Sequence, residues 1–326
     1  MVQSLVLPKV AILPVTMACN ARCKMCNIWH TENEKELSID DYNKIFSQPI
    51  LCENISSVNI TGGEPFLRKD LLEITNTLLS CCKVLDSVVV NSNGFLTEEI
   101  CKYFLQLKDQ LDSSRRIKLF LFLSLDGIGQ LHDEIRGVSG AFGLVERTLL
   151  KLRDYSHVDV ILNTTVTKYN YTQLEDILCF AEEMNCKIDF TYAMSSEIYF
   201  NNVQTLETAD GFVRGEFISF LKQNLKNGTL YNSPSYYRNL IHMLSGKKRK
   251  VGCVFSNQGF FLKPDGSVYR CWPIEEVIGN IHTMSFMDIW NNMQPFDQQR
   301  CDNCYNNCYY LYKRSNAIQR LSGSMI

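Results

Sequence analysis

The chain has no long hydrophobic run and no marked excess of charge of either sign. No apolar run approaches the roughly 18 residues that a membrane-spanning helix needs, and the apolar segment 1–16 is interrupted by Pro8, Lys9 and Pro14. That segment has neither the positively charged N-terminal region nor the small-residue cleavage site of a signal peptide. We therefore expect it to form a buried strand. The net charge is −2. We therefore expect a cytoplasmic protein with no membrane partner and no nucleic-acid partner.

Histidine is scarce, and its 5 copies show no metal-ligand spacing, whereas cysteine is abundant at 14 copies. Without a signal peptide, clustered cysteines indicate metal binding or redox chemistry rather than disulfide bonds. Two groups stand out. The first has the order Cys-x₃-Cys-x₂-Cys and consists of Cys19, Cys23 and Cys26. The second lies near the C-terminus and consists of Cys253, Cys271, Cys301, Cys304 and Cys308.

Short β-rich runs alternate with longer helical patterns over residues 10–200. The expected strands are 10–16, 57–61, 87–91, 119–126, 158–166 and 188–193. The expected helices lie near 39–48, 68–83, 97–110, 140–154 and 171–185. Most of the strand runs are continuously apolar, which is typical of parallel strands. Repeated βα units form a barrel or an open doubly wound sheet, and in both the ligands bind at the C-terminal ends of the strands. The polar motifs of this chain lie at those ends.

The first cysteine group lies in the sequence CNARCKMC (19–26), which resembles the cluster loop of the radical S-adenosylmethionine superfamily. Three thiolates can hold three irons of a 4Fe–4S cluster and leave the fourth iron open, because full protein ligation takes four. A zinc site would instead favour paired Cys-x₂-Cys units. Met25 departs from the family pattern, which usually has an aromatic residue there, and Trp29 could supply aromatic cover. The resemblance implies an α/β fold with a partial (βα)₆ TIM-like barrel, which we expect over residues 1–204.

The same resemblance assigns residues to S-adenosylmethionine. Three residues of the GGEP motif would hold the methionine amino group: Gly62, Gly63 and Glu64. Glycines let the backbone approach a ligand closely, and a carboxylate accepts hydrogen bonds from an ammonium group. Ser124 and Arg136 would hold the methionine carboxylate, although Arg136 could instead form a surface ion pair with Asp133 or Glu134. The other expected contacts, to the methionyl, ribose and adenine parts, are Asn91, Ser92, Asn93, Asn163 and the backbone near Ala193.

The second cysteine group resembles the SPASM/twitch extension of this superfamily. Cys253, Gly266 and Cys271 fit its opening pattern Cys-x₉₋₁₅-Gly-x₄-Cys, and a hairpin over residues 259–272 would turn both sulfurs toward one cluster. We expect this domain over residues 250–326, after a helical bridge at 205–249. A full SPASM domain has seven cysteines and two clusters, so the five here favour one auxiliary 4Fe–4S cluster. A zinc ribbon is the alternative.

The expected ligands of the auxiliary cluster are Cys253, Cys271, Cys301 and Cys304. Cys308 could replace one of them, or it could remain free as a catalytic residue. A free thiol suits an epimerase, which needs a hydrogen-atom donor on the opposite face of the substrate radical. A dehydrogenase instead needs an acceptor for a second electron, and an auxiliary cluster suits that role.

The resemblance implies reductive cleavage of S-adenosylmethionine to a 5′-deoxyadenosyl radical that takes a hydrogen atom from a substrate carbon. A flavodoxin- or ferredoxin-type protein would supply the electron. We expect dehydrogenation or epimerisation of a small-molecule or carbohydrate-type natural product, because the chain shows no N-terminal winged-helix module for a peptide leader. Two alternatives are a ribosomal-peptide maturase that forms a crosslink or an epimer, and a non-catalytic iron–sulfur electron carrier. Residues that could line a substrate pocket, although most such aromatics are core residues, are Tyr192, Glu197, Tyr199, Tyr236, Tyr237 and Arg238.

Overall fold

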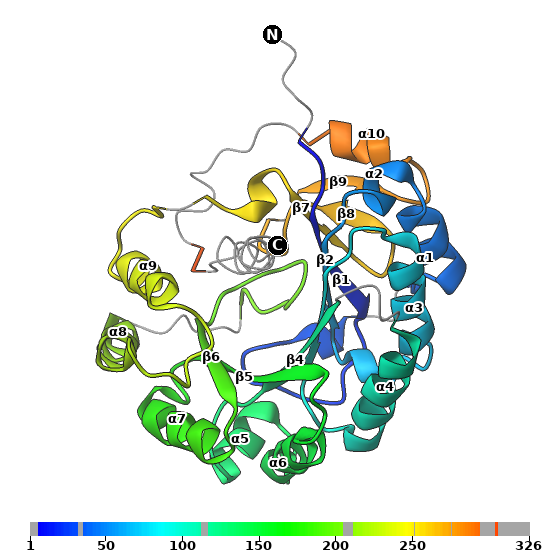
Figure 1. Ribbon diagram of the computed structural model, residues 1–326. Coiled ribbons are helices and arrows are strands. Elements are labelled where there is room, and N and C mark those ends of the chain that lie inside the picture. Colours follow the sequence, from blue (N-terminus) through cyan, green and yellow to red (C-terminus); the bar gives the residue numbers. More distant parts are fainter. Residues whose placement is uncertain are drawn as a thin grey trace, which may run out of the picture.

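The computed structural model describes residues 6–31, 35–111, 117–204, 211–250, 252–274, 276–293 and 304–305. Within these residues, nine strands form one curved sheet in the order β6-β5-β4-β3-β2-β1-β7-β8-β9 (Figure 1). The strands are β1 Val10–Thr16, β2 Ser57–Gly62, β3 Ser87–Ser92, β4 Lys118–Ser124, β5 Val158–Val166, β6 Lys187–Tyr192, β7 Gly259–Leu262, β8 Ser267–Tyr269 and β9 Val277–Asn280.

The α-helices lie around the outside of the curved sheet (Figure 1). Those of the first part of the chain are α1 Ile39–Phe46, α2 Pro49–Cys52, α3 Leu71–Cys81, α4 Thr97–Gln110, α5 Gln130–Arg136, α6 Ala141–Leu152 and α7 Leu174–Glu183. The later ones are α8 Gly211–Asn224, α9 Pro234–Leu244 and α10 Phe286–Asn291. In the part of the chain that is described, no helix combines the length and the apolar character needed to span a bilayer.

Strands β1 to β6 are parallel, and each is paired with the next along the chain. This confirms an α/β fold with the parallel sheet of a partial TIM barrel. The six strands match the expected runs to within one or two residues at most ends. β4 shows how the sequence produces this layer: Leu119, Leu121 and Leu123 are buried, while the alternate residues are half-buried and face the other side. Because successive side chains in a strand point to opposite faces, the leucines pack under the helices.

The expected helices are present, and α8 and α9 lie in the expected helical bridge. Among the described residues, three further α-helices, α2, α5 and α10, lie outside the expected ranges. On α3, Leu71, Ile74 and Leu78 form the buried face that their spacing predicts. The start of α1 has a capping box, in which Ser38 and Asp41 exchange side-chain and backbone hydrogen bonds. Local sequence signals therefore account for most of the helical layer.

The C-terminal hairpin joins the barrel sheet directly. β7 pairs in parallel with β1, with Val10 opposite Gly259, and β8 pairs antiparallel with β7, with Phe261 opposite Tyr269. The hairpin that the sequence predicts is thus present, and it extends the sheet past β1. The domain boundaries at 204/205 and 249/250 stay a prediction, since a continuous hydrogen-bonded ladder connects the first and last of the predicted units.

Candidate active site

A cavity of about 330 Å³ opens where the parallel strands end at their carboxyl termini. The cysteine loop that follows β1 forms one side, and the last residues of β2 to β6 form the floor. Most of the residues that the sequence assigned to the cluster and to S-adenosylmethionine meet here: Cys19, Cys23, Cys26, Gly62, Gly63, Asn91, Ser92, Asn93, Ser124, Arg136, Asn163 and Ala193. Met25 and Trp29 also line the cavity, as expected of residues that cover the cysteine loop.

The cysteine loop is held by the end of helix α5. The backbone N–H groups of Arg22 and Lys24 donate to the carbonyl oxygens of Arg136 (2.8 Å) and Ile135 (2.9 Å). These carbonyls belong to the last turn of a helix, where no intrahelical partner is available. Gly137 ends the helix at φ +66°, and a Cβ there would lie 2.5 Å from the Arg22 carbonyl oxygen. A glycine is therefore needed for the helix to approach the loop this closely.

Burial changes the acidity of the three cysteines. It raises the pKa of the Cys19 thiol to about 11 and that of Cys26 to about 12, and it also raises the pKa of Cys23. All three thiols are therefore protonated near neutral pH in the metal-free chain, and metal binding must release those protons. Among the described residues, no three His, Cys, Asp or Glu side chains are arranged to hold a single metal ion. Thiolates on a 4Fe–4S cluster each bind a different iron, so they need not converge on one point. That Cys19, Cys23 and Cys26 bind three corners of such a cluster stays a prediction, which their common place in the cavity lining supports.

Two glycines bring the end of β2 against the entry to the cysteine loop. A Cβ on Gly62 would lie 2.2 Å from the Thr16 carbonyl oxygen, and one on Gly63 would lie 2.0 Å from the Ala18 carbonyl oxygen. The N–H of Gly63 donates to Thr16 O at 2.8 Å, and the N–H of Glu64 donates to Ala18 O at 2.8 Å. This close backbone contact joins the GGEP segment to the loop that carries the cysteines.

Glu64 lies outside the cavity lining and is almost fully buried. Its carboxylate accepts hydrogen bonds from Ser92 Oγ (2.9 Å) and from the backbone N–H groups of Asn93 (2.8 Å) and Phe66 (3.2 Å). Burial raises the pKa of this carboxyl to about 7, while the three donors oppose that shift. In these contacts Glu64 holds Ser92 and Asn93 in the cavity wall. Its role as a ligand of the methionine amino group stays a prediction.

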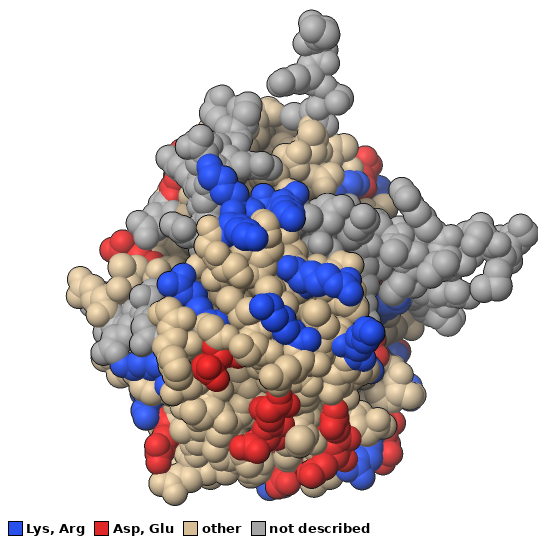
Figure 2. Space-filling model, turned by 90° about the vertical axis from the view of Figure 1, so that its left-hand side faces the viewer, with Lys and Arg blue, Asp and Glu red and all other residues tan. Residues whose placement is uncertain are grey.

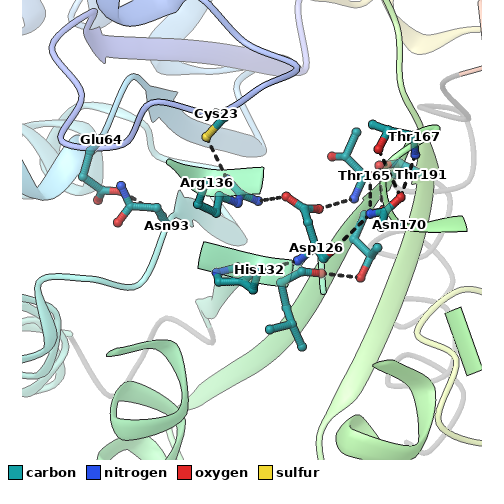
Figure 3. A network of polar contacts seen from close by, with 12 residues as sticks. Cys23, Glu64, Asn93, Asp126, His132, Arg136, Thr165, Thr167, Asn170 and Thr191 are labelled. Atoms are coloured by element: carbon teal, nitrogen blue, oxygen red, sulfur yellow. Dashed lines mark hydrogen bonds and ion pairs between the residues drawn. The ribbon is translucent and has the colours of Figure 1, made fainter. Parts of the chain in front are cut away.

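Only 11% of the Arg136 side chain is exposed, and it forms an ion pair with Asp126, so the alternative of a surface ion pair with Asp133 or Glu134 is wrong. Its Nη2 lies 2.5 Å from Asp126 Oδ2, and its Nη1 donates to Cys23 Sγ at 3.6 Å (Figure 3). The Asp133 carboxylate instead accepts from backbone N–H groups at the start of α6. The sequence reasoning missed Asp126, although its position in the SLDG motif at the end of β4 was a signal.

Asp126 is fixed from several sides, as Figure 3 shows. Its Oδ1 accepts from the backbone N–H of Thr165 at 2.8 Å, and its carbonyl oxygen accepts from Asn170 Nδ2 at 3.0 Å. Its own N–H donates to His132 Nδ1 at 3.0 Å. Burial lowers the pKa of His132 to about 3, so this imidazole is neutral and can accept that bond. The carboxylate therefore presents its second oxygen to Arg136 in a defined position.

Aromatic side chains form the wall opposite the strand ends. Tyr199 and Phe200 come from the segment after β6, and Trp272 comes from the C-terminal hairpin region. The ring centroids of Phe200 and Trp272 lie 5.0 Å apart, and the Tyr199 hydroxyl lies 2.8 Å from Thr61 Oγ1. Sequence reasoning named Tyr199 and Tyr192, which also lines the cavity, as possible pocket residues. It missed Phe200 and Trp272, and no local pattern identified them.

Of the remaining residues named from sequence, Tyr236 and Tyr237 are buried outside the cavity lining, and Tyr237 donates to Asp189 Oδ1 at 2.9 Å. Arg238 is exposed on α9. Glu197 is not among the residues that line the cavity. These four residues therefore do not belong to the cavity.

The second cysteine group is described in part. Cys253 and Cys271 stand on either side of the β7–β8 hairpin, and the Cys304 carbonyl oxygen accepts a hydrogen bond from Arg249 Nη2 at 2.7 Å. Cys301 and Cys308 lie outside the described residues. The assignment of Cys253, Cys271, Cys301 and Cys304 as ligands and of Cys308 as a free thiol stays a prediction.

Residues 13–181 match the model of the radical SAM superfamily, and the chain belongs to that superfamily. Residues 253–309 match the SPASM model, described as an iron–sulfur cluster-binding domain, so the chain also carries a C-terminal SPASM domain. The radical SAM domain implies S-adenosylmethionine and a 4Fe–4S cluster, and the SPASM domain implies auxiliary iron–sulfur binding. These findings confirm the family and the cofactors that the two cysteine motifs predict.

Several characterised proteins are similar to this chain. The AdoMet-dependent heme synthase of Oleidesulfovibrio alaskensis is 27% identical over 316 residues, which cover 88% of this chain and 75% of that protein. The antilisterial bacteriocin subtilosin biosynthesis protein AlbA of Bacillus subtilis is 24% identical over 295 residues, which cover 88% of this chain and 60% of AlbA. At these identities the relatives share the fold and family with this chain, and they do not define its substrate.

Two solved structures have a similar fold. Native anSMEcpe with bound AdoMet superimposes with a TM-score of 0.66 at 19% identity, over 90% of this chain and 84% of that chain. Streptococcus suis SuiB bound to the precursor peptide SuiA superimposes with a TM-score of 0.59 at 16% identity, over 95% of this chain and 67% of that chain.

Proposed function

We propose that this radical SAM enzyme removes a hydrogen atom from a carbon of an uncharged, hydrogen-bonding substrate, and that the substrate is a peptide. The observation that carries the proposal is the lack of net charge in the cavity. Among the described residues that line the cavity, Arg136 is the only one of the Lys, Arg, Asp and Glu types. Its positive charge is balanced by the carboxylate of Asp126. The charged methionyl part of S-adenosylmethionine would be held by the cluster and by Arg136, as the family resemblance implies. A charged group of the substrate would then lose hydration without gaining a counter-charge from the remaining described lining residues.

The cavity floor offers neutral hydrogen-bonding groups. Amide and hydroxyl side chains project from five strands, β2 to β6: Asn59, Thr61, Asn91, Ser92, Ser124, Asn163, Thr165 and Thr191. Such groups both donate and accept, so they suit peptide amides or alcohol groups. The aromatic wall of Trp29, Tyr199, Phe200 and Trp272 offers apolar surface to the remainder of a ligand.

The relatives favour a peptide among the neutral substrates. AlbA is named for bacteriocin biosynthesis, and SkfB of Bacillus subtilis, 26% identical over 175 residues, is named a sporulation killing factor maturation protein. SuiB was solved with its precursor peptide. We therefore propose peptide maturation, by crosslinking or epimerisation. A hydroxyl-rich small molecule or carbohydrate, dehydrogenated or epimerised at one carbon, is the second candidate, which the amide and hydroxyl floor also suits.

When bound, the cluster and S-adenosylmethionine supply a 5′-deoxyadenosyl radical that abstracts a hydrogen atom. In this proposal the chain has three tasks. Cys19, Cys23 and Cys26 bind the cluster, and the polar strand ends orient S-adenosylmethionine and the substrate. Tyr199 and the neighbouring aromatic side chains exclude water from the cavity, which protects a reactive species from side reactions.

The test uses the full chain, reconstituted with iron and sulfide without oxygen and supplied with S-adenosylmethionine and dithionite. We expect 5′-deoxyadenosine from the unaltered chain and none from Cys23→Ala. Uniformly deuterated uncharged peptides and deuterated polyols are then added in separate reactions. Deuterium in the 5′-deoxyadenosine from peptides alone supports the peptide proposal, and deuterium from polyols alone supports the second candidate. Cleavage without deuterium from either class would reject both and leave the family assignment intact.

We also propose where the electron donor docks. Arg238 on α9 and Lys247, Lys248 and Lys250 after it are exposed, and we call them the basic face. Figure 2 shows the side of the molecule on which α9 lies in Figure 1. Lys and Arg side chains gather over the upper half of this side, and Asp and Glu side chains gather over the lower half. Arg249, in the same segment, bonds to the backbone of Cys304. An acidic carrier of the flavodoxin or ferredoxin type has the complementary charge and would dock beside the SPASM residues.

A further inference from the structure

Arg136 connects a buried carboxylate with the sulfur of a cysteine in the cluster loop. Its Nη2 lies 2.5 Å from Asp126 Oδ2, and its Nη1 donates to Cys23 Sγ at 3.6 Å (Figure 3). The side chain of Arg136 is 11% exposed and that of Asp126 is 0% exposed. Within the described residues, the buried Arg136 Nε has no hydrogen-bond partner. Both terminal nitrogens of the guanidinium are therefore engaged with the protein before any ligand binds.

We propose that Asp126 is a positioning residue that holds Arg136 against Cys23, and that the Arg136–Cys23 hydrogen bond raises the reduction potential of the cluster. The proposal rests on Cys23 being a cluster ligand. One-electron reduction adds a negative charge to the cluster and its thiolates. A cationic N–H donor at a ligand sulfur stabilises that added charge, and hydrogen bonds to the sulfurs are among the factors that set cluster potentials. The interaction is stronger in a buried site than in water.

The surroundings of Asp126 explain why Arg136 keeps this position. The other carboxylate oxygen of Asp126 is bonded to the N–H of Thr165, and the backbone of Asp126 is bonded on both sides, by Asn170 and His132. The side chain therefore cannot rotate away without losing a buried hydrogen bond. The contact of Asp126 with Arg136 is an ion pair, and outer contacts of this kind orient the groups that touch a metal centre and thereby tune the metal.

A second role of Arg136 has to be separated from this one. The family resemblance assigns Arg136 to the methionine carboxylate, and that role alone would leave the potential of the cluster unchanged when S-adenosylmethionine is absent. The proposed role predicts a change in the absence of S-adenosylmethionine. The measurement is therefore a redox titration of the full reconstituted chain without S-adenosylmethionine, followed by electron paramagnetic resonance. The relevant signal is the one that is lost when Cys19, Cys23 and Cys26 are all replaced by alanine.

We expect Arg136→Gln to make reduction of this cluster about tenfold less favourable, which corresponds to a potential lower by about 59 mV for one electron. Asp126→Asn should lower the potential in the same direction. An asparagine has a single acceptor oxygen, so it can serve the N–H of Thr165 or Arg136 but not both, and it has no negative charge to hold the guanidinium against Cys23. The double variant should fall no further than Arg136→Gln, because both changes break one connected contact. Arg147→Gln, on the exposed side of α6, should leave the potential unchanged.

An unchanged potential in Arg136→Gln with full iron content overturns the proposal, and weaker binding of S-adenosylmethionine alone would assign Arg136 to the carboxylate role. A potential in Asp126→Asn equal to or above that of the unaltered chain overturns the positioning role of Asp126. If the Arg136→Gln variant does not bind the cluster, the Arg136→Lys variant is titrated in its place. Lysine keeps the charge but not the two-pronged geometry, so we expect a smaller fall, and no fall overturns the proposal. The signal of the auxiliary cluster should survive the triple alanine replacement, and a triple variant that loses no signal at all rejects the ligand assignment itself.

Discussion

The Tyr199 hydroxyl lies 2.8 Å from Thr61 Oγ1, which joins the segment after β6 to the end of β2 across the cavity. The same hydroxyl donates to the carbonyl oxygen of Gly62 at 3.2 Å. Tyr199 is buried, and its ring lies 5.3 Å from that of Phe261 and 6.4 Å from that of Trp272. One side chain thus links the GGEP segment, the aromatic wall and the C-terminal hairpin.

This contact predicts that Tyr199→Phe weakens both the fold and the binding of S-adenosylmethionine. Loss of a buried hydroxyl hydrogen bond costs about 1 kcal/mol in the free energy of unfolding, measured by urea denaturation of the metal-free chain. The freed Thr61 hydroxyl and Gly62 carbonyl should also shift the cavity wall. Binding of S-adenosylmethionine to the reconstituted protein, measured by calorimetry, should therefore weaken severalfold.

Tyr103→Phe is the matched control for this change. Tyr103 is also buried, and its hydroxyl lies 2.8 Å from Thr75 Oγ1, but neither residue lines the cavity. We expect a similar loss of stability with no change in affinity for S-adenosylmethionine. Equal affinity losses in both variants would mean that Tyr199 acts only through general stability.

Gly137→Ala is expected to reduce the iron content of the first cluster. The position has φ +66°, and an alanine Cβ would meet the Arg22 carbonyl oxygen at 2.5 Å, so the cysteine loop must move away from α5. Gly140→Ala carries a comparable backbone strain at φ +77°, but it has open space around the Cβ. Both variants should lose about 1–2 kcal/mol of stability from the left-handed conformation. The electron paramagnetic resonance signal of the cluster bound by Cys19, Cys23 and Cys26 should fall only in Gly137→Ala. An equal fall in Gly140→Ala would contradict the inference that α5 holds the cysteine loop in place.

The barrel and most of the cavity residues could be predicted because their signals are local. Continuous apolar runs identify the strands, and the polar residues that follow β2, β3 and β4 reach one rim since parallel strands end at the same edge. The pairing of Arg136 could not be predicted in this way. Asp133 and Glu134 are its closer neighbours along the chain, but Asp133 bonds to the start of α6, and Arg136 turns inward to Asp126.

The pairing of strands that lie far apart along the chain could not be predicted from the sequence either. The parallel ladder between β1 and β7 joins segments from opposite ends of the chain, and nothing in either strand specifies the partner. Trp272 follows a predicted cluster ligand, Cys271, and it reaches the cavity only because that ladder places the hairpin beside the cysteine loop. Both findings depend on how the whole sheet closes, which no local pattern records.

Glu64→Gln is expected to destabilise the protein by about 1–3 kcal/mol, because a buried donor loses its partner. The carboxylate accepts backbone N–H bonds on both oxygens, from Phe66 on one and Asn93 on the other. A glutamine amide must therefore point its NH₂ group at one of these donors in either orientation. Urea denaturation of the metal-free chain measures the loss. Glu216→Gln, at an exposed site on α8, should cause no measurable loss, and equal stability of both variants would contradict the buried acceptor role.

Reversal of charge on the basic face is expected to slow electron delivery. In Lys247→Glu/Lys250→Glu, an acidic flavodoxin should reduce the enzyme on the order of tenfold more slowly at low salt, because docking loses its electrostatic steering. Stopped-flow mixing with reduced flavodoxin measures the rate, and the difference should shrink at high salt, where screening is strong. Lys102→Glu/Lys108→Glu makes the same change of net charge on exposed residues of α4, so its rate should stay near that of the unaltered chain. Equal slowing in both double variants would show that net charge, not the basic face, controls the encounter.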